Sequence, residues 1–183
     1  VDLRICDELG KEIAQGEIGT LEVRGPNVFS GYWQMPEKTA EEFRETDDGG
    51  DAWFITGDLG TIDTDGYVTI VGRGKDLIIS GGYNIYPKEI EDAINDVAGV
   101  LESAVFGVPD ADFGESVVAA VVLETGTSLS ADNIADAIAP VLARFKHPRR
   151  YVMLAALPRN TMGKVQKNVL RDTHAPQTAK SRD

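Results

Sequence analysis

Gly72-Arg73-Gly74-Lys75, at residues 72–75, marks the point where the pattern of apolar residues changes, and this change decides the fold. Before it, apolar and polar residues alternate with the period of two that favours half-buried strands. After it, segments with helical spacing alternate with apolar runs of strand length. Because two glycines interrupt regular structure there, we expect a boundary between two lobes. The sequence predicts an α+β protein: a β-rich first lobe (residues 1–74), a small α+β second lobe (75–172) and a tail (173–183).

Upstream of the boundary, short alternating runs predict strands joined by tight turns. The strands are expected at residues 1–5, 21–23, 53–55, 59–62 and 67–71. Asp65-Gly66 is a strong hairpin signal before the last of these runs. Pro36 favours the start of a short helix that extends to Glu45, since proline fits the first helical turn. The first lobe should therefore be mainly sheet.

Downstream of the boundary, helices and apolar strands alternate. Strands are expected at residues 77–79, 103–108, 115–123 and 151–154, and helices at residues 87–98, after Ser130 and at residues 165–172. Ser130 is a good N-cap, and Pro140 should shorten or kink the helix that follows it. The core face of that helix is expected to consist of Ile134, Ala137, Ile138 and Val141. The stretch Ser80 to Asn84 is interpreted as a tight connection from a strand to the helix at Pro87.

Composition excludes several classes of protein. Hydrophobic residues make up 42% and charged residues 26% of the 183 residues, the balance of a soluble globular protein. The longest uncharged apolar run, Val117–Leu123, is far shorter than the roughly 18 residues that cross a bilayer, and the first residues form no signal peptide. The single cysteine, Cys6, excludes a disulfide framework within one chain and should be a small buried hydrophobe. We therefore expect a cytoplasmic protein with no membrane partner.

Charge is distributed unevenly along the chain. Residues 1–143 carry a net charge of −20, whereas residues 144–183 carry +8. The acidic part is typical of a solvated surface, and the basic end could serve nucleic acid, a phosphorylated small molecule or no ligand. A nucleic-acid module would need stacking aromatic residues near the positive charge, and only Phe145 and Tyr151 lie there. We therefore expect no nucleic-acid partner.

Two charged residues near the boundary could bind a nucleotide. Asp58 follows an aromatic strand in Thr56-Gly57-Asp58, where a carboxylate could accept both hydroxyls of a ribose. The alternative is an Asx turn. Arg73 lies between two glycines, so its guanidinium could reach a ribose oxygen or a phosphate, although a surface arginine would look the same.

A lysine near the end of the chain could act on a leaving group. Lys164 ends the loop at residues 158–164, which we expect to be flexible because a glycine precedes the lysine. An ammonium there could counter the charge that develops as pyrophosphate leaves. The alternative is a solvated lysine near a helix start, and Lys167 has the same alternative with less reason to be catalytic.

Other candidate residues are weak. His147 and His174 lie among basic residues without metal-ligand spacing, so no metal site is expected. Tyr32, Trp33 and Trp53 are expected to pack in the core rather than to stack on bases. Gly81-Gly82 could let backbone approach a ligand closely.

The order of these motifs resembles one family. The motifs are Gly-Glu-Ile-Gly at 16–19, Gly25-Pro26, Gly31-Tyr32-Trp33, Thr56-Gly57-Asp58, Asp65-Gly66-Tyr67, residues 72–76, Gly81-Gly82, Glu89-Ile90-Glu91 and residues 158–164. Over about residues 1–172 the chain resembles the C-terminal third of the adenylate-forming acyl-CoA synthetases, the superfamily of firefly luciferase and peptide-synthetase adenylation domains. The resemblance implies the β-rich end of a large AMP-binding domain followed by a small, mobile α+β C-terminal domain.

The resemblance also implies a two-step reaction. A carboxylic acid attacks ATP to give an acyl-adenylate and pyrophosphate, and the sulfur of CoA then displaces AMP. Asp58 matches the residue that holds the ribose hydroxyls, Arg73 the arginine that contacts ribose or phosphate, and Lys75 the hinge. Lys164 matches the lysine required for adenylation, which is often regulated by a lysine acetyltransferase. The CoA tunnel is matched by Gly81, Gly82 and Tyr83.

Parts of the family pattern are missing from this sequence. The phosphate loop and the adenine-binding segment are not found, so we expect a fragment that is inactive without the N-terminal portion of the enzyme, and Mg²⁺ ligands outside it. The loop at residues 158–164 and the stretch Ser80 to Asn84 look closest to malonyl-CoA synthetases, which implies malonate or methylmalonate and a place in fatty acid metabolism. An adenylation domain that serves a carrier protein is the alternative within the superfamily, and a non-catalytic interaction module with a basic tail is the alternative outside it.

Overall fold

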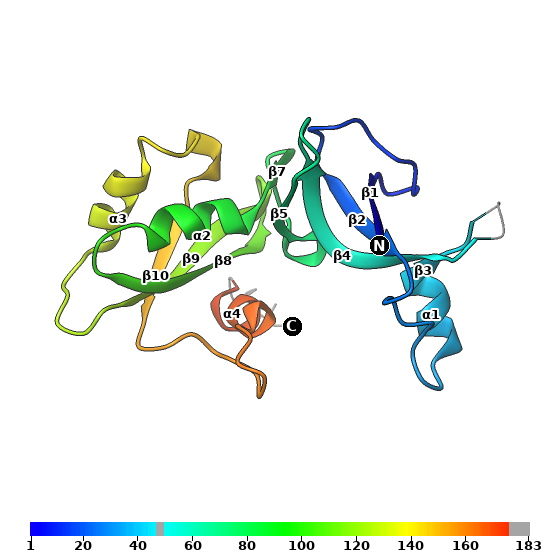
Figure 1. Ribbon diagram of the computed structural model, residues 1–183. Coiled ribbons are helices and arrows are strands. Elements are labelled where there is room, and N and C mark those ends of the chain that lie inside the picture. Colours follow the sequence, from blue (N-terminus) through cyan, green and yellow to red (C-terminus); the bar gives the residue numbers. More distant parts are fainter. Residues whose placement is uncertain (47–49, 176–183) are drawn as a thin grey trace, which may run out of the picture. The chain divides into compact units, whose positions relative to one another are not determined.

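The computed structural model describes residues 1–46 and 50–175, and the chain divides into two compact units. The first unit is Val1–Lys75 and the second begins at Asp76, one residue beyond the expected boundary (Figure 1). Most of the expected tail, residues 176–183, lies outside the described residues. The identification of the first unit as the end of a larger domain, and of the second as a mobile domain, stays a prediction.

The first unit is an antiparallel sheet with one short helix. Its strands are β1 (Asp2–Cys6), β2 (Gly19–Arg24), β3 (Phe43–Arg44), β4 (Trp53–Ile62) and β5 (Val68–Arg73), and its helix is α1 (Pro36–Glu42). The strand order is β1-β2-β4-β3, and β5 also pairs with β4. The helix ends before Glu45 because Phe43 and Arg44 pair with Phe54 and Trp53 as strand β3.

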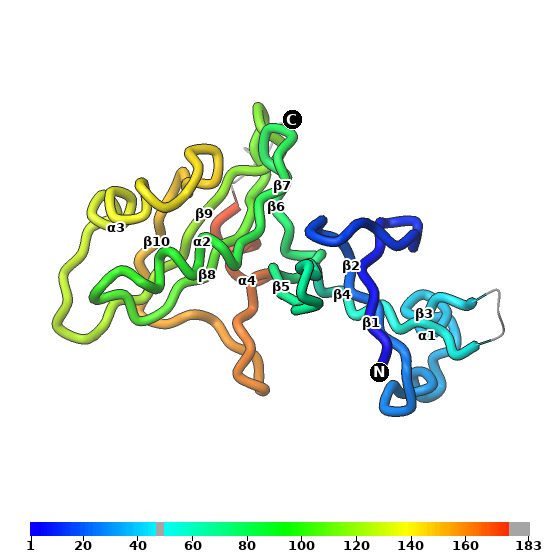
Figure 2. Tube along the Cα trace, turned by 45° about the horizontal axis from the view of Figure 1, so that its top comes forward, coloured from blue at the N-terminus to red at the C-terminus, as the bar shows by residue number. Residues whose placement is uncertain are grey.

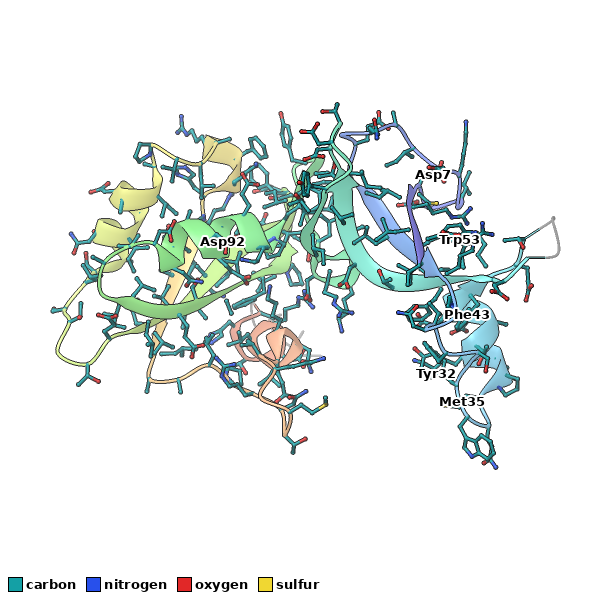
Figure 3. All side chains as sticks on the ribbon, in the orientation of Figure 1. Asp7, Tyr32, Met35, Phe43, Trp53 and Asp92 are labelled. Carbon is teal, nitrogen blue, oxygen red and sulfur yellow. The ribbon has the colours of Figure 1, made fainter. Side chains whose placement is uncertain are left out.

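Three aromatic residues of the first unit, Trp53, Tyr32 and Trp33, were predicted to pack in the core, and they differ in how far they are buried. Trp53 is buried, with the guanidinium of Arg4 4.2 Å and that of Arg24 4.5 Å from its ring centroid. Tyr32 is partly buried and meets Phe29 edge-on at 5.1 Å between ring centroids. The prediction for Trp33 is wrong, because 87% of this residue is exposed. Figure 3 labels Trp53 within the sheet and Tyr32 near helix α1.

The second unit is a mixed sheet with helices on both faces. Its strands are β6 (Ile78–Ser80), β7 (Tyr83–Ile85), β8 (Val100–Asp110), β9 (Gly114–Leu123) and β10 (Arg150–Leu154), and its α-helices are α2 (Pro87–Asn95), α3 (Ala131–Ile138) and α4 (Lys167–His174). Short 3₁₀ turns are η1 (Gly74–Asp76), at the junction of the units, and η2 (Arg144–Lys146). The order β10-β9-β6-β7, with β8 also on β9, is antiparallel except for the parallel pair β9–β10.

Alternation along β9 explains why helices cover both faces of this sheet. Ala119 and Val121 point into a cluster that includes Ile90 of α2 and Ile134 of α3. The intervening Val118, Ala120 and Val122 pack in a second cluster that includes Leu170 of α4. Successive residues of a strand face opposite sides, so an uninterrupted apolar strand needs a cover on each side. Figures 1 and 2 show α2 and α3 on one side of β8–β10 and α4 on the other.

Helix ends in the second unit follow local chemistry. Ser130 forms the predicted cap, since its side chain accepts a hydrogen bond from the Asn133 backbone N–H at 3.2 Å. Because α3 ends at Ile138, just before Pro140, Val141 is not part of the core face: 67% of it is exposed, and Leu142 is buried instead. Ala137 is likewise exposed, which corrects the predicted face.

Two other helices also differ in length from the prediction. Helix α2 stops at Asn95, three residues short of the predicted end. Helix α4 runs from Lys167 to His174, so it reaches into the segment expected to be a tail. Over the described ranges, every helix is too short or too polar to span a bilayer.

Candidate functional site

Asp58 lies in a bulge of strand β4. Ile55 pairs with Glu22 and Leu59 with Thr20, so Thr56, Gly57 and Asp58 together face the single residue Leu21 of β2. This explains why the expected strands 53–55 and 59–62 are one strand with an irregular middle. Gly57 adopts φ +73°, a left-handed conformation that glycine takes without strain.

The side chain of Thr56 holds this bulge. Its hydroxyl donates a hydrogen bond to the Leu21 carbonyl at 2.8 Å and accepts one from the Asp58 N–H at 3.1 Å. Both bonds are partly buried. The backbone that carries the Asp58 carboxylate is therefore fixed to the neighbouring strand.

Asp58 and Arg73, the two predicted nucleotide-binding residues, are brought together. They are cross-strand partners in β4 and β5, and Arg73 Nε lies 2.7 Å from Asp58 Oδ1. The Arg73 side chain is 52% exposed, and that of Asp58 is 24% exposed. A guanidinium offers five N–H donors and a carboxylate several acceptor positions, so both groups keep capacity for a ligand beyond their own contact.

Lys75, the predicted hinge, lies in η1 and is the last residue of the first unit. Its side chain is exposed. The next residue, Asp76, is tied into the second unit, because its carboxylate accepts a hydrogen bond from Arg171 of α4 at 3.1 Å. The position at the junction of two compact units is consistent with a hinge, and the role itself stays a prediction.

Gly81 and Gly82 form the turn of a β-hairpin, not the expected connection from strand to helix. Strands β6 and β7 pair as Ile78–Ile85, Ile79–Asn84 and Ser80–Tyr83, and the turn residues have φ +57° and +81°. Two consecutive positive φ angles are those of a tight two-residue turn that matches strand twist. Tyr83, directly after the turn, is 55% exposed.

The hairpin turn borders a pocket of about 380 Å³ in the second unit. The Tyr83 ring stacks on Phe145, with 4.5 Å between ring centroids and 24° between ring planes. On the same pocket, the guanidinium of Arg149 lies 3.7 Å from the ring centroid of Phe113. Sequence reasoning assigned no site role to Phe113, Phe145 or Arg149, although the place of Phe145 and Arg149 in the basic end of the chain was a usable signal. Aromatic faces beside guanidinium groups suit a base and its phosphates.

A larger pocket lies elsewhere, in the first unit. It measures about 540 Å³ and is lined mainly by residues beside α1, among them Tyr32, Trp33 and Phe43. None of the predicted site residues lines it, and among the described lining residues Glu45 is the one that carries a charge. Its volume therefore does not mark it as the site of the predicted chemistry.

Lys164 lies at the end of a hydrogen-bonded loop between β10 and α4. Arg159 and Val165 form an isolated antiparallel bridge, and the Lys164 N–H donates to Asn160 Oδ1 at 2.9 Å. The segment was expected to be flexible. In the structure, backbone and side-chain hydrogen bonds close the loop at its base and across its middle.

The two lysines of this region differ in their partners. The side chain of Lys167 is paired with Glu91 at 2.7 Å, and both side chains are largely buried. Lys164 is exposed, and across residues 1–46 and 50–175 no carboxylate forms an ion pair with its ammonium. Of the two, Lys164 is the one able to meet an incoming anion.

Two residues with shifted pKa values, Cys6 and Tyr151, are not among the predicted site residues. Burial raises the pKa of the Cys6 thiol to about 11, and the neighbouring Glu22 carboxylate adds to the rise. The thiol therefore stays protonated near neutral pH, as expected for a structural cysteine and not for a nucleophile. Burial likewise raises the pKa of the Tyr151 phenol to about 12.

In the described parts of the chain, no three His, Cys, Asp or Glu side chains come together in a way that could hold a metal ion. His147, expected at the surface, is partly buried, and its Nε2 lies 3.0 Å from the Leu142 carbonyl oxygen.

The chain is similar in sequence and in fold to known proteins. The family described as the AMP-binding enzyme C-terminal domain matches residues 89–164. The chain is 47% identical over 163 residues to a methyl-dioxo-octahydro-indenyl propanoyl:CoA ligase of Rhodococcus jostii, covering 89% of this chain and 31% of the relative. It is 41% identical over 170 residues to a feruloyl-CoA synthase of Amycolatopsis, covering 93% and 33%. The crystal structure of ATP-bound MatB from Rhodopseudomonas palustris is similar with a TM-score of 0.85 and 57% identity, over 94% of this chain and 33% of that one. The chain thus spans about a third of the length of these proteins.

Proposed function

Because residues 89–164 belong to the AMP-binding enzyme C-terminal domain, we propose that this chain is the C-terminal portion of an ATP-dependent acid:CoA ligase. In the first step, a carboxylate oxygen attacks the α-phosphorus of ATP, and the bond to the β-phosphate oxygen breaks to release pyrophosphate. In the second step, the CoA thiol, losing its proton, attacks the acyl carbon and AMP leaves. The relatives named as CoA ligases support this class of reaction.

The observation that carries the proposal is the exposed Lys164 ammonium without a carboxylate partner among the described residues. Negative charge grows on the phosphates as pyrophosphate departs, and a cation placed there stabilises the transition state more than the ground state. A lysine already neutralised by a buried carboxylate, as Lys167 is by Glu91, could contribute much less. Lys164 is therefore assigned the catalytic role in adenylation.

Asp58 and Arg73 are assigned to the nucleotide. The Asp58 carboxylate would accept the ribose hydroxyls, and Arg73, held 2.7 Å from it, would direct further N–H donors at ribose or phosphate. Their support is the fixed bulge of β4, because a preorganised carboxylate loses little entropy when it binds. Lys75 is assigned as the hinge about which residues 75–172 move between the two steps.

CoA is assigned to the pocket beside the β6–β7 turn. Gly81 and Gly82 offer backbone without side chains, so the pantetheine arm could pass close to it. The Tyr83–Phe145 stack and the Arg149 guanidinium supply an aromatic face and a cation, which fit an adenine and a phosphate.

The proposal is tested in a chimera. Residues 1–175 replace the corresponding C-terminal third of Rhodopseudomonas palustris MatB, and release of pyrophosphate and formation of acyl-CoA are measured. Activity well above that of truncated MatB supports the proposal, and a folded chimera without either step contradicts it. Lys164→Ala should lower adenylation about a hundredfold or more, the scale of one lost electrostatic donor, while it spares thioester formation from preformed acyl-adenylate. Lys88→Ala, which removes an exposed lysine paired with Asp92 on α2, is the matched control and should change neither step.

Malonate or methylmalonate is the proposed acid. Its support is the resemblance of the loop at residues 158–164 and of the stretch Ser80 to Asn84 to malonyl-CoA synthetases. The test is a complete enzyme in which the chain follows its own adenylating domain, with kcat/KM compared for malonate, methylmalonate, acetate and a longer acid. Preference for a monocarboxylic acid would refute malonate, and transfer to a carrier protein but not to CoA would favour an adenylation domain.

Several further parts of the proposal concern the whole enzyme. Mg²⁺ is expected to accompany ATP, with ligands outside the described residues of this chain. The exposed Lys164 ammonium is the proposed target of a lysine acetyltransferase, and acetylation would abolish its charge. A cytoplasmic location is proposed because the substrates ATP and CoA are found there. Mass analysis after treatment with an acetyltransferase, compared between Lys164→Arg and the unaltered chain, tests the modification.

A further inference from the structure

We propose that Asn160 is the positioning residue for Lys164, an inference that rests on the function proposed above. A lysine carries a flexible four-carbon side chain, so the location of its ammonium depends first on how well its backbone is fixed. Gly163 directly precedes Lys164 and has φ +80° with open space around its α-carbon. Without a brace, such a glycine would allow the following residue many orientations.

Asn160 supplies the brace from both its side chain and its backbone. Its side-chain Oδ1 accepts hydrogen bonds from the Lys164 N–H at 2.9 Å and from the Met162 N–H at 3.0 Å. Its backbone N–H donates to the Lys164 carbonyl at 2.9 Å, and its carbonyl accepts from the Gly163 N–H at 2.9 Å. Both backbone polar groups of Lys164 are therefore bound to the same residue.

The brace is itself anchored to the sheet. Arg159, the preceding residue, donates through Nη1 to the Gly163 carbonyl at 2.7 Å and through Nη2 to the Glu102 carboxylate of β8. At the other end of the loop, the Gln166 N–H donates to the Pro158 carbonyl at 2.8 Å. The loop is therefore fixed relative to β8, and Asn160 fixes the backbone of Lys164 relative to the loop.

The chemistry of the asparagine suits this task. A carboxamide oxygen has two lone pairs, so it can accept from two N–H groups at once, and it does so without a charge. A neutral brace does not compete with an anionic substrate for the ammonium of Lys164. Alanine at this position would remove both side-chain bonds, whereas a serine hydroxyl can form the same type of turn more weakly.

The first test measures the loop alone, in the 183-residue chain. Asn160→Ala should speed amide hydrogen exchange at Met162 and Lys164 by about tenfold, the scale expected when such hydrogen bonds are lost. Asn160→Ser should give an intermediate rate. Asn168→Ala, an exposed position on α4, is the matched control and should leave both amides unchanged. Equal exchange rates in Asn160→Ala and the unaltered chain would overturn the inference.

The second test measures function in the MatB chimera. Asn160→Ala should lower the rate of adenylation about tenfold, because fewer molecules hold the ammonium in place, and leave thioester formation from acyl-adenylate unchanged. Asn160→Ser should restore part of the rate. A parallel loss in both steps, or no loss in adenylation where Lys164→Ala is severely impaired, would refute positioning while leaving the proposed function standing. If the unaltered chimera makes no adenylate, the proposed function fails, and the exchange test still decides whether Asn160 orders the loop.

Discussion

Glu22→Gln is predicted to destabilise the first unit strongly, because Glu22 is a fully buried carboxylate shared by two arginines. Arg4 donates to its Oε2 from Nε at 2.9 Å and from Nη2 at 2.6 Å, and Arg44 Nε donates to its Oε1 at 3.0 Å. The two arginine side chains are 20% and 32% exposed, whereas the Glu22 side chain is not exposed at all. Cys6 also lies within hydrogen-bonding reach of this carboxylate, but the three bonds from the arginines replace most of the solvation it has lost.

The size of the effect follows from that geometry. Glutamine keeps the shape of the side chain, removes the charge and turns an amide donor toward one of the arginine donors. Removing one partner of a buried ion pair costs about 3–5 kcal/mol. Because both guanidinium groups reach water and can recover part of their solvation, we expect a value near the lower limit, about 3 kcal/mol.

The assay is urea unfolding followed by tryptophan fluorescence. Both tryptophans, Trp33 and Trp53, lie in the first unit, so the signal reports on that unit alone, and Trp33→Phe restricts it to the buried Trp53. With a slope of about 1 kcal/mol per molar urea for so small a unit, the midpoint should fall by about 3 M. Asp2→Asn breaks the exposed pair of Asp2 with Arg24 and should cost at most about 1 kcal/mol. If Glu22→Gln costs no more than this control, the buried network does not stabilise the unit and the reasoning is wrong.

Three other predictions concern the hinge, the turn and pH. In the chimera, Lys75→Pro should slow at least one of the two half-reactions by restricting φ at the junction, and unchanged rates in both would remove the hinge assignment. Gly82→Val should lower the affinity for CoA measured by calorimetry and raise the KM for CoA, because valine is strained at φ +81°, while the KM for ATP stays the same; an equal rise in both would point to general unfolding. The free energy of unfolding should fall as pH rises, since the Cys6 thiol has a pKa raised from 9.0 to about 11 and the Tyr151 phenol from 10.0 to about 12. The stability linked to each proton is fully present below the pKa of the unfolded state and is lost as pH rises through the pKa of the folded state. Cys6→Ala should therefore remove the part of the fall between pH 9 and 11, as measured by urea unfolding at each pH. An unchanged pH profile of the free energy of unfolding would contradict the burial argument.

Most strands and helices could be predicted from apolar periodicity, because that pattern reflects which faces are buried. The apolar strand over residues 115–123 is an example: its two faces needed two covers, and the structure supplies α2 and α3 on one and α4 on the other. The N-cap at Ser130 could be predicted for a different reason, since a cap is local chemistry; the return bond from Asn133 that completes a capping box was not predicted.

The observed elements differ from the predicted ones where contacts between residues far apart in the sequence outweigh the local pattern of apolar residues. Strand β7 has only three residues, too few to show a period, and only its pairing with β6 identifies Gly81-Gly82 as a hairpin turn. Strand β4 continues through Gly57 because β2 accepts the bulge on the other side. Helix α1 ends early because Phe43 finds a partner in β4.

The candidate site was predictable as residue types but not as contacts. Both Asp58 and Arg73 were predicted from the sequence to bind the nucleotide, but only the register of β4 and β5 shows that they are neighbours. Asn160 could not be predicted as a functional residue, because nothing in its local pattern shows that its amide oxygen accepts a hydrogen bond from the Lys164 backbone N–H. Phe145 and Arg149 likewise join Tyr83 and Phe113 only through the tertiary fold.

The ion pair between Asp76 and Arg171 joins the first residue of the second unit to its last helix. A unit whose first residue is paired with the last helix that the structure describes can be transferred to another protein as one piece, because the pair keeps these two segments together.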